Sequence, residues 1–156
     1  MSQMCYNIIM SLITNRKAGF NYEILDKYTA GIELFGFEVK SLQKGQGSLD
    51  GAHVTVRGGE VFVVGMFVPP YQPNNTPKDY EPERNRRLLL QKKEIRDLEK
   101  NEQTKSLTII PLSVYNKGSK IKLDIALVRG KKKYDKRETL KKKDTMRDVA
   151  RDLKAH

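Results

Sequence analysis

The chain has few of the residue types from which catalytic and metal sites are usually built. Its 156 residues include one cysteine, Cys5, two histidines, His53 and His156, and no tryptophan. A single cysteine excludes an internal disulfide and a cysteine-cluster zinc site, and we expect an inert thiol in a reducing cytosol. No serine, histidine and aspartate form a recognisable nucleophile motif. These absences favour a binding protein without metal or cofactor over an enzyme.

Long apolar runs are also missing. The run at residues 8–13 is far shorter than the roughly 20 residues that a membrane-spanning helix needs. No cationic region precedes it and no small-residue cleavage site follows it. We interpret this run as an edge strand or an arm that packs on the body, and residues 1–14 as the N-terminal arm. A cytoplasmic protein without a membrane partner is expected.

Positive charge is in excess and is concentrated at one end of the chain. Lysine and arginine number 30 against 19 acidic residues, a net charge of +11. Residues 129–156 hold 12 basic and five acidic residues (+7), and residues 1–128 hold 18 and 14 (+4). A basic tail on a mildly basic body indicates a polyanionic partner, with nucleic acid ahead of an anionic membrane. We therefore divide the chain into an arm (1–14), a body (15–128) and a tail (129–156).

Short alternating segments predict that the body is mainly β. Apolar residues recur at every second position in several stretches, which is the periodicity of strands. About six strands at short spacing, interrupted by two small helices, predict a closed antiparallel barrel, because closure removes exposed strand edges. The expected strands lie at 20–34, 54–56, 61–64, 84–90, 107–115 and 121–127, the helices at 39–42 and 92–103, and a proline-rich surface loop at 69–83.

Two acidic residues and one glycine loop are the remaining candidates for chemistry. Glu33 and Glu38 could serve a metal-dependent RNA hydrolase, although a solvent-facing strand carboxylate and a first-turn helix carboxylate explain them equally well. The loop at residues 45–48 lacks the rest of a P-loop and is interpreted as a turn that contacts an RNA backbone.

Two basic clusters on the body are more informative. They are Asn15-Arg16-Lys17 and Arg84-Asn85-Arg86-Arg87. Each alone is typical of a solvated charge run, but two on one small barrel with a basic tail favour an RNA-facing role. The planar fork of arginine grips phosphate in a bidentate fashion and stacks on bases.

The tail has a helical pattern of its own. Between residues 138 and 154, Met146, Val149, Ala150 and Leu153 share a narrow stripe beside a ridge of basic residues. In water this helix should fray, and against a polyanion it should form over roughly 25 Å. The alternative is a permanently flexible, solubilising tail.

These stretches together resemble the SmpB family, the SsrA-binding proteins. The resemblance covers about residues 15–145 and is carried, in order, by residues 15–18, 30–32, 36–42, 59–62, 84–90 and 130–137. It implies a monomeric oligonucleotide-binding-type barrel that binds the tRNA-like end of tmRNA (SsrA RNA) and delivers it to stalled bacterial ribosomes. It also implies a tail that enters the decoding centre and the mRNA channel, near rRNA, and no chemistry of its own. A generic basic ribosome-associated protein remains the non-enzymatic alternative.

The resemblance and the basic clusters together give two sets of site residues. The expected tmRNA face is Asn15, Arg16, Lys17, Glu38, Lys40, Lys44, Arg84, Arg86, Arg87 and Leu89. The expected ribosome-binding tail is Lys131, Lys132, Lys133, Tyr134, Asp135, Lys136, Arg137, Lys141, Lys142, Lys143 and Arg147, with the ring at position 134 suited to stacking on a nucleobase. The chain departs from the family pattern at Thr29, Gln43, Gln46, Ser48 and His53, and the changes at 43 and 46 remove two cationic contacts from one edge.

Overall fold

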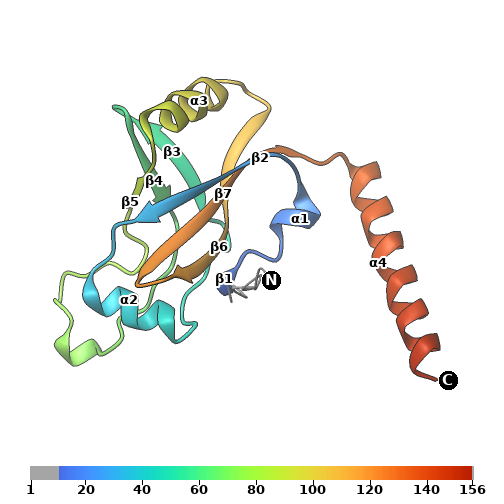
Figure 1. Cartoon of the computed structure of the whole chain (residues 1–156), viewed down its shortest axis with the longest axis horizontal. Coiled ribbons are helices and arrows are strands. Elements are labelled where there is room, and N and C mark those ends of the chain that lie inside the picture. Colours follow the sequence, from blue (N-terminus) through green and yellow to red (C-terminus); the bar gives the residue numbers. More distant parts are fainter. Residues whose placement is uncertain (1–10, 156) are drawn as a thin grey trace, which may run out of the picture.

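The structure is a computed structural model and describes residues 11–155 (Figure 1). Cys5, His156 and the predicted arm before residue 11 lie outside the described residues. The elements, in chain order, are β1 (Ser11–Thr14), α1 (Ala18–Asn21), β2 (Tyr22–Ile32), α2 (Gly36–Gln43), β3 (His53–Arg57), β4 (Glu60–Val64), the 3-10 turn η1 (Pro73–Asn75), β5 (Arg86–Leu89), α3 (Lys92–Glu102), β6 (Leu107–Lys117), β7 (Lys120–Gly130) and α4 (Lys133–Lys154).

Six of the strands close into a ring. The strand order is β1-β6-β3-β4-β5-β2-β7, and β7 also pairs with β6, so that the sheet returns on itself. All the pairings are antiparallel, and β1 pairs with β6 at Ser113, Val114 and Tyr115, beyond the contact of β6 with β3. The contact between β3 and β6 is the narrowest seam, with one register pair, Val54 opposite Ile109. The prediction of a mainly β, closed antiparallel barrel is confirmed, and Ser11–Thr14 is the expected edge strand.

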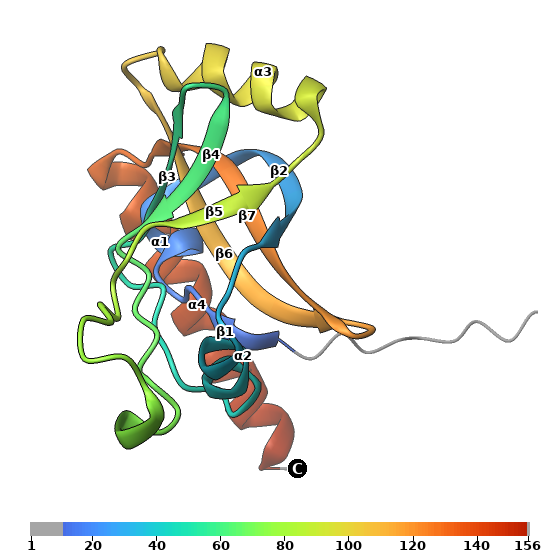
Figure 2. The same ribbon diagram turned by 90° about the vertical axis from the view of Figure 1, so that its left-hand side faces the viewer.

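The barrel interior holds the main core. Ile121, Leu123, Ile125 and Leu127 alternate along β7 and all pack inside, as their spacing predicted. The helix α3 closes one end of the ring, where Leu98 is fully buried in the same core (Figure 2). One face of β7 therefore lines the barrel interior, and the strand pairs with β2 on one side and β6 on the other.

A second, smaller cluster lies on the outer face of β6 and β7. Ala126 and Val128 are buried there against Ala18 of α1 and Ile110 of β6. The sequence pattern predicted a strand that begins at residue 20. This start was wrong, because residues 18–21 form α1, which covers the outer face of β7. The strand β2 begins only at Tyr22.

The helices α2 and α3 begin with the same type of N-terminal capping hydrogen bond. The carboxylates of Glu38 and Glu94 each accept a hydrogen bond from the backbone N–H three residues earlier, Phe35 at 2.9 Å and Gln91 at 3.0 Å. An acidic residue at this position satisfies an N–H that has no partner within the helix. Both helices were predicted. The expected first-turn role of Glu38 is confirmed.

The tail continues from β7 as a single helix. The structure begins α4 at Lys133, five residues before the predicted start, and no side chain within Lys133–Lys154 is buried. In Figure 1 the helix runs beside the barrel, and its first turns lie close to α1. No helix within residues 11–155 is both long and apolar enough to cross a membrane.

A candidate nucleic-acid interface

Glu38 lies at the centre of a buried ion cluster between α2 and the end of the proline-rich loop. Its side chain has no exposed surface. Oε2 accepts from Arg84 Nη2 at 2.7 Å and from the Phe35 amide. Oε1 accepts from both Arg86 Nε (3.1 Å) and Arg86 Nη2 (2.9 Å), from Arg84 Nε (2.9 Å) and from the Tyr80 hydroxyl (3.0 Å). The carboxylate is thus enclosed by donors on both oxygens.

The pKa of Glu38 reflects this enclosure. Burial alone raises the pKa, because it penalises the charged carboxylate. The hydrogen bonds from Arg84, the Phe35 amide and Arg86 act in the opposite direction and outweigh burial, so the pKa is lower than usual. The neighbouring Tyr80 has a raised pKa, because of burial and then its bond to Glu38. Glu38 is therefore a permanent anion at neutral pH.

Arg86 is the buried partner of this anion. Its side chain is fully buried, and all three guanidinium nitrogens are used within the protein. Beyond Glu38, Nη1 donates to the carbonyl oxygens of Met66 (2.7 Å) and Arg84 (3.1 Å), and Nη2 donates to that of Pro82 (2.9 Å). The sequence placed Arg86 and Glu38 on the RNA face. The structure corrects this placement, since neither side chain reaches the surface, and gives them the role of tying the loop to α2.

Arg84 links the cluster to the surface. Its side chain is one quarter exposed, and its guanidinium carbon lies 4.1 Å from the centroid of the Phe35 ring. Two of its nitrogens already donate to Glu38. Arg84 therefore has fewer N–H groups left for a phosphate than the sequence suggested, and it cannot offer Nε and Nη2 together to a partner.

The first basic cluster lies at the turn between β1 and α1. The Asn15 side-chain amide donates to the carbonyl of Pro111 at 3.1 Å, which fixes this turn on β6. Arg16 and Lys17 line a hollow of about 270 Å³ opposite the glycine loop that includes Gly47. Lys17 pairs with Asp50 at 3.3 Å while both side chains remain mostly exposed. Arg16 and Lys17 are open to solvent, and Asn15 holds their backbone in place.

A lysine pair at the C-terminal end of α2 forms a second exposed basic site. Lys40 and Lys44, one helical turn apart, place their Nζ atoms 5.8 and 4.9 Å from the centroid of the Tyr71 ring. The hydroxyl of buried Ser41 donates to the carbonyl of Pro69 at 2.6 Å and so holds the loop beside them. Sequence reasoning found both lysines but missed Tyr71. The only signal for it was an aromatic residue within the proline-rich loop.

The outward face of β5 carries Arg87 and Leu89. Arg87 is within ion-pair distance of Glu33 (3.7 Å) and Glu60 (3.2 Å). Leu89 is half exposed and lies over Gly31, where an added Cβ would approach Leu89 Cβ to 3.2 Å. Leu89 also lines a groove of about 340 Å³ whose other wall includes Lys120 and Lys122 of the β6–β7 hairpin. Neither lysine was among the expected site residues.

Thr29, one of the departures from the family pattern, lies beside a carboxylate of the neighbouring strand. Thr29 of β2 lies opposite Asp124 of β7 and donates to its Oδ1 at 3.0 Å. The Tyr115 hydroxyl donates to the same oxygen at 3.1 Å. The surface around Thr29 thus has a carboxylate supplied by the adjacent strand.

Lys131 is set apart from the rest of the predicted ribosome-binding tail. Its backbone N–H donates to the carbonyl of Asn21, and its Nζ donates to Gly19 O at 3.0 Å and Thr139 Oγ1 at 3.3 Å. It therefore anchors the start of α4 on α1. The other members of that set are exposed, except half-buried Lys136, and Tyr134 is 69% exposed.

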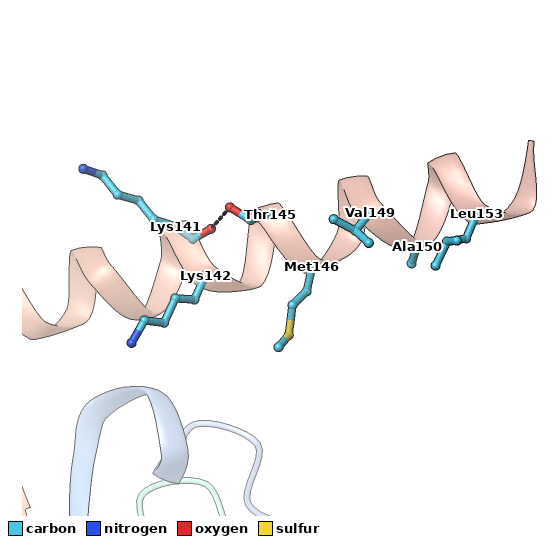
Figure 3. A pocket seen from close by; sticks show the side chains of 7 residues that line it. All are labelled: Lys141, Lys142, Thr145, Met146, Val149, Ala150 and Leu153. Carbon is cyan, nitrogen blue, oxygen red and sulfur yellow. Dashed lines mark hydrogen bonds between the residues drawn. The ribbon is translucent and has the colours of Figure 1, made fainter.

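The far half of α4 presents the predicted apolar stripe. Figure 3 shows Met146, Val149, Ala150 and Leu153 along the helix, with Lys141 and Lys142 one to two turns earlier. Met146 and Leu153 are more than 70% exposed. The stripe and the lysines line one shallow surface formed by α4 alone.

Glu33 and Glu38 do not form the acid pair that a hydrolase needs. Glu38 is enclosed by arginine, tyrosine and backbone donors, whereas Glu33 is exposed beside Arg87. The two oxygens of Glu38 together accept six hydrogen bonds from the protein, which leaves no lone pair directed at a metal. Residues 11–155 contain no group of three or more histidine, cysteine or acidic side chains arranged to hold a metal ion. Nothing in the geometry favours the hydrolase alternative.

Comparisons with known proteins give consistent results. The family model described as SmpB protein matches residues 12–155. The SsrA-binding protein of Elusimicrobium minutum is 50% identical over 141 residues, which are 90% of this chain and 89% of the relative. That of Gloeobacter violaceus is 45% identical over 92% of this chain and 93% of its own length.

A solved structure agrees with these relatives. It is described as "tmRNA-SmpB: a journey to the center of the bacterial ribosome" and superimposes with a TM-score of 0.65 at 38% identity. The match covers 78% of this chain and 85% of the other. The family model spans both the barrel and α4, and the relatives exceed 40% identity over nearly their whole length. The chain therefore belongs to the SmpB family.

Proposed function

We propose that this protein binds tmRNA (SsrA RNA) through its barrel and delivers it to stalled bacterial ribosomes in trans-translation. The observation that supports this most strongly is the family match over residues 12–155, because it includes the barrel and the basic helix in one unit. The named relatives are SsrA-binding proteins, and the related structure concerns tmRNA and SmpB on the ribosome. In this role the protein acts in the cytoplasm, as a monomer, without a metal, a cofactor or a covalent step.

The proposed tmRNA face consists of the exposed residues of the predicted set. Arg16 and Lys17 beside the glycine loop, Lys40 and Lys44 on α2, and Arg87 with Leu89 on β5 are open to an RNA partner. Lysine and arginine neutralise phosphates and release counterions, which supplies most of the affinity for a folded RNA. Asn15, Glu38 and Arg86 support this face from within, and Arg84 contributes its exposed edge.

The proposed ribosome-binding element is α4. Its exposed cations, from Lys132 to Arg147, suit the rRNA of the decoding centre and the mRNA channel, where neutralisation removes their mutual repulsion. Exposed Tyr134 can stack on a nucleobase, which is worth roughly 1–3 kcal/mol. Lys131 is proposed to hold the start of α4 against α1 rather than to contact the ribosome.

A pull-down from a bacterial lysate tests the RNA partner directly. The full chain should recover one small stable RNA with an alanyl-tRNA-like end, and a filter-binding titration with purified tmRNA should saturate. Recovery of bulk rRNA or anionic lipid in its place would indicate the generic basic protein. RNA cleavage that depends on a divalent metal and is lost in Glu38→Gln would revive the hydrolase.

A further inference from the structure

A cleft lined by aromatic side chains lies beside the N-terminus of α2, apart from the basic surfaces. Its volume is about 400 Å³. Three rings form a continuous row: Phe35 and Phe37 have centroids 5.5 Å apart, and Phe37 meets Tyr80 edge-on at 4.7 Å. Phe35 is half exposed, so the row is open to solvent. An exposed aromatic row in a cleft is the kind of surface that binds a partner.

The rim of this cleft is acidic, although the protein as a whole is strongly basic. Asp79 and Glu81 line the cleft and are exposed. Residues 69–83 contain one lysine against three acidic residues, in a chain whose net charge is +11. Arg84 at the cleft and the buried Arg86 share one carboxylate, Glu38, at 2.7 and 2.9 Å, so these three side chains together carry one net positive charge. The loop residues 69–83 contribute two net negative charges, so the surroundings of the cleft keep an excess of one negative charge, which favours a cation over a phosphate at its mouth.

From these features we propose that the cleft binds an arginine or lysine side chain of a basic protein segment. The ring faces that Arg84 leaves uncovered attract a cation, and the two carboxylates on the rim add Coulombic attraction and hydrogen-bond acceptors. An RNA strand meets repulsion at the same place. This inference concerns a protein partner and extends the proposed function, which assigns RNA partners to the basic surfaces.

The cleft is held in shape before a partner arrives. Tyr80 places its hydroxyl between Glu38 and the carbonyl of Val68, at 3.0 and 2.8 Å, and so fixes one end of the aromatic row. Arg84 covers Phe35 at 4.1 Å. A preformed site loses little side-chain entropy on binding, which favours recognition of even a single cationic side chain.

Fluorescence provides a direct test, because the chain has no tryptophan. Phe35→Trp places a single reporter in the cleft, to be titrated with a blocked arginine–glycine heptapeptide. We expect a saturable change. Adding Glu81→Lys should weaken binding about tenfold, since it reverses one rim charge. The matched control, Glu99→Lys, makes the same change on the exposed face of α3, at the other end of the molecule (Figure 2), and should leave binding within about twofold.

The contrary outcomes are distinct. No saturable change, equal weakening by Glu81→Lys and Glu99→Lys, or saturation by an oligouridylate instead of the peptide would each overturn the proposal. Amide-shift mapping of the unmodified protein with the same peptide is independent of the tryptophan variant. Shifts centred on Phe37 and Tyr80 support the cleft, and shifts spread over α3 contradict it.

A ribosome assay separates this inference from the proposed function. Glu81→Lys should lower the association of the tmRNA complex with purified ribosomes severalfold while tmRNA affinity stays within about twofold of the unmodified protein. A parallel loss of tmRNA affinity would make the cleft an RNA site and overturn the inference. If the unmodified chain failed to bind tmRNA at all, the proposed function would fail while the peptide titration still decided the cleft.

Discussion

Arg86 donates two hydrogen bonds to a single oxygen of Glu38, from Nε at 3.1 Å and from Nη2 at 2.9 Å, although the two residues are 48 positions apart in the chain. Both side chains are fully buried. This pair joins the first turn of α2 to the start of β5, and the further bonds of Arg86 to the carbonyls of Pro82 and Arg84 hold the end of the proline-rich loop there. The exposed lysines of α2 and the outward residues of β5 are placed relative to each other by this internal contact.

Removing the charge of Glu38 should destabilise the fold strongly. Glu38→Gln leaves the guanidinium of Arg86 buried without its anion, which costs about 3–5 kcal/mol of unfolding free energy. Urea unfolding monitored by circular dichroism measures the loss. Glu33→Gln is the matched control, because Glu33 is exposed, and should change stability by less than about 0.5 kcal/mol. Similar losses in both variants would refute the central role of Glu38.

The same carboxylate gives the stability a definite pH dependence. The pKa of Glu38 in the folded protein is lowered from its ordinary value of 4.5, so the unfolded chain takes up a proton at a higher pH than the folded one. Its contribution is complete above the ordinary pKa and is lost as pH falls through the folded pKa. Unfolding free energies measured from about pH 6 to about pH 3 should decline less steeply in Glu38→Gln than in the unmodified protein. Parallel curves would contradict this expectation.

Gly47 should not tolerate a side chain. It has a φ of +137°, and an added Cβ would lie 2.8 Å from Ile13 Cδ1 and 2.9 Å from the carbonyl oxygen of Phe67. Gly47→Ala should cost about 1–3 kcal/mol in thermal or urea unfolding. Gly19→Ala is the control, because no atom lies within 4 Å of its added Cβ. The idea is wrong if Gly47→Ala is as stable as Gly19→Ala.

Binding of tmRNA should depend steeply on salt. If five to eight phosphates are neutralised, the log–log slope of affinity against salt is about −4 to −7. Replacing both Lys40 and Lys44 by alanine should flatten the slope by about 2, because each phosphate contact contributes about 1. Filter binding across a salt series gives the slope. The α3 pair Lys93 and Lys100, changed in the same way, should leave it unaltered, and a flat response of the unmodified protein would exclude electrostatic RNA binding.

Removal of α4 should separate the two proposed activities. Because β7 continues through Gly130 and Lys131 bonds to Asn21, the chain is best ended after Lys132. The shortened protein should bind tmRNA within a few-fold of full affinity and lose peptide tagging on stalled ribosomes. Loss of tmRNA binding with an intact circular dichroism spectrum would show that the barrel and α4 do not divide the work.

The strands and helices with a regular spacing of apolar residues could be predicted from the sequence. The expected strands at 54–56, 61–64 and 121–127 and the expected helix at 92–103 are all present, because the periodicity that predicted them is a local signal. The barrel followed from the number and spacing of strands. The short helix α1 was missed, since its four residues carry no periodicity, and it is formed because Ala18 covers the outer face of β7.

The candidate site was less predictable for a physical reason. A basic residue in a cluster looks the same in sequence whether it faces water or an internal carboxylate. Arg86 and Arg87 are adjacent on a strand and therefore point to opposite faces, one toward Glu38 and one outward. Only the register of β5 in the ring decides which arginine is buried. Tyr71 likewise meets Lys44 only through the folded loop.

The helix α4 follows β7 after only two residues, so its direction depends on the backbone at Lys131 and Lys132. β7 is hydrogen-bonded on both sides, to β2 and to β6, up to Arg129, so the strand end that precedes α4 is held in the sheet. The 22 residues of α4 extend about 33 Å beyond it at 1.5 Å per residue. A rotation of about 10° around the Lys131–Lys132 linkage thus displaces the far tip by about 6 Å. Small changes in the backbone torsion angles of Lys131 and Lys132, beside Gly19, therefore move Leu153 by a distance comparable to one nucleotide.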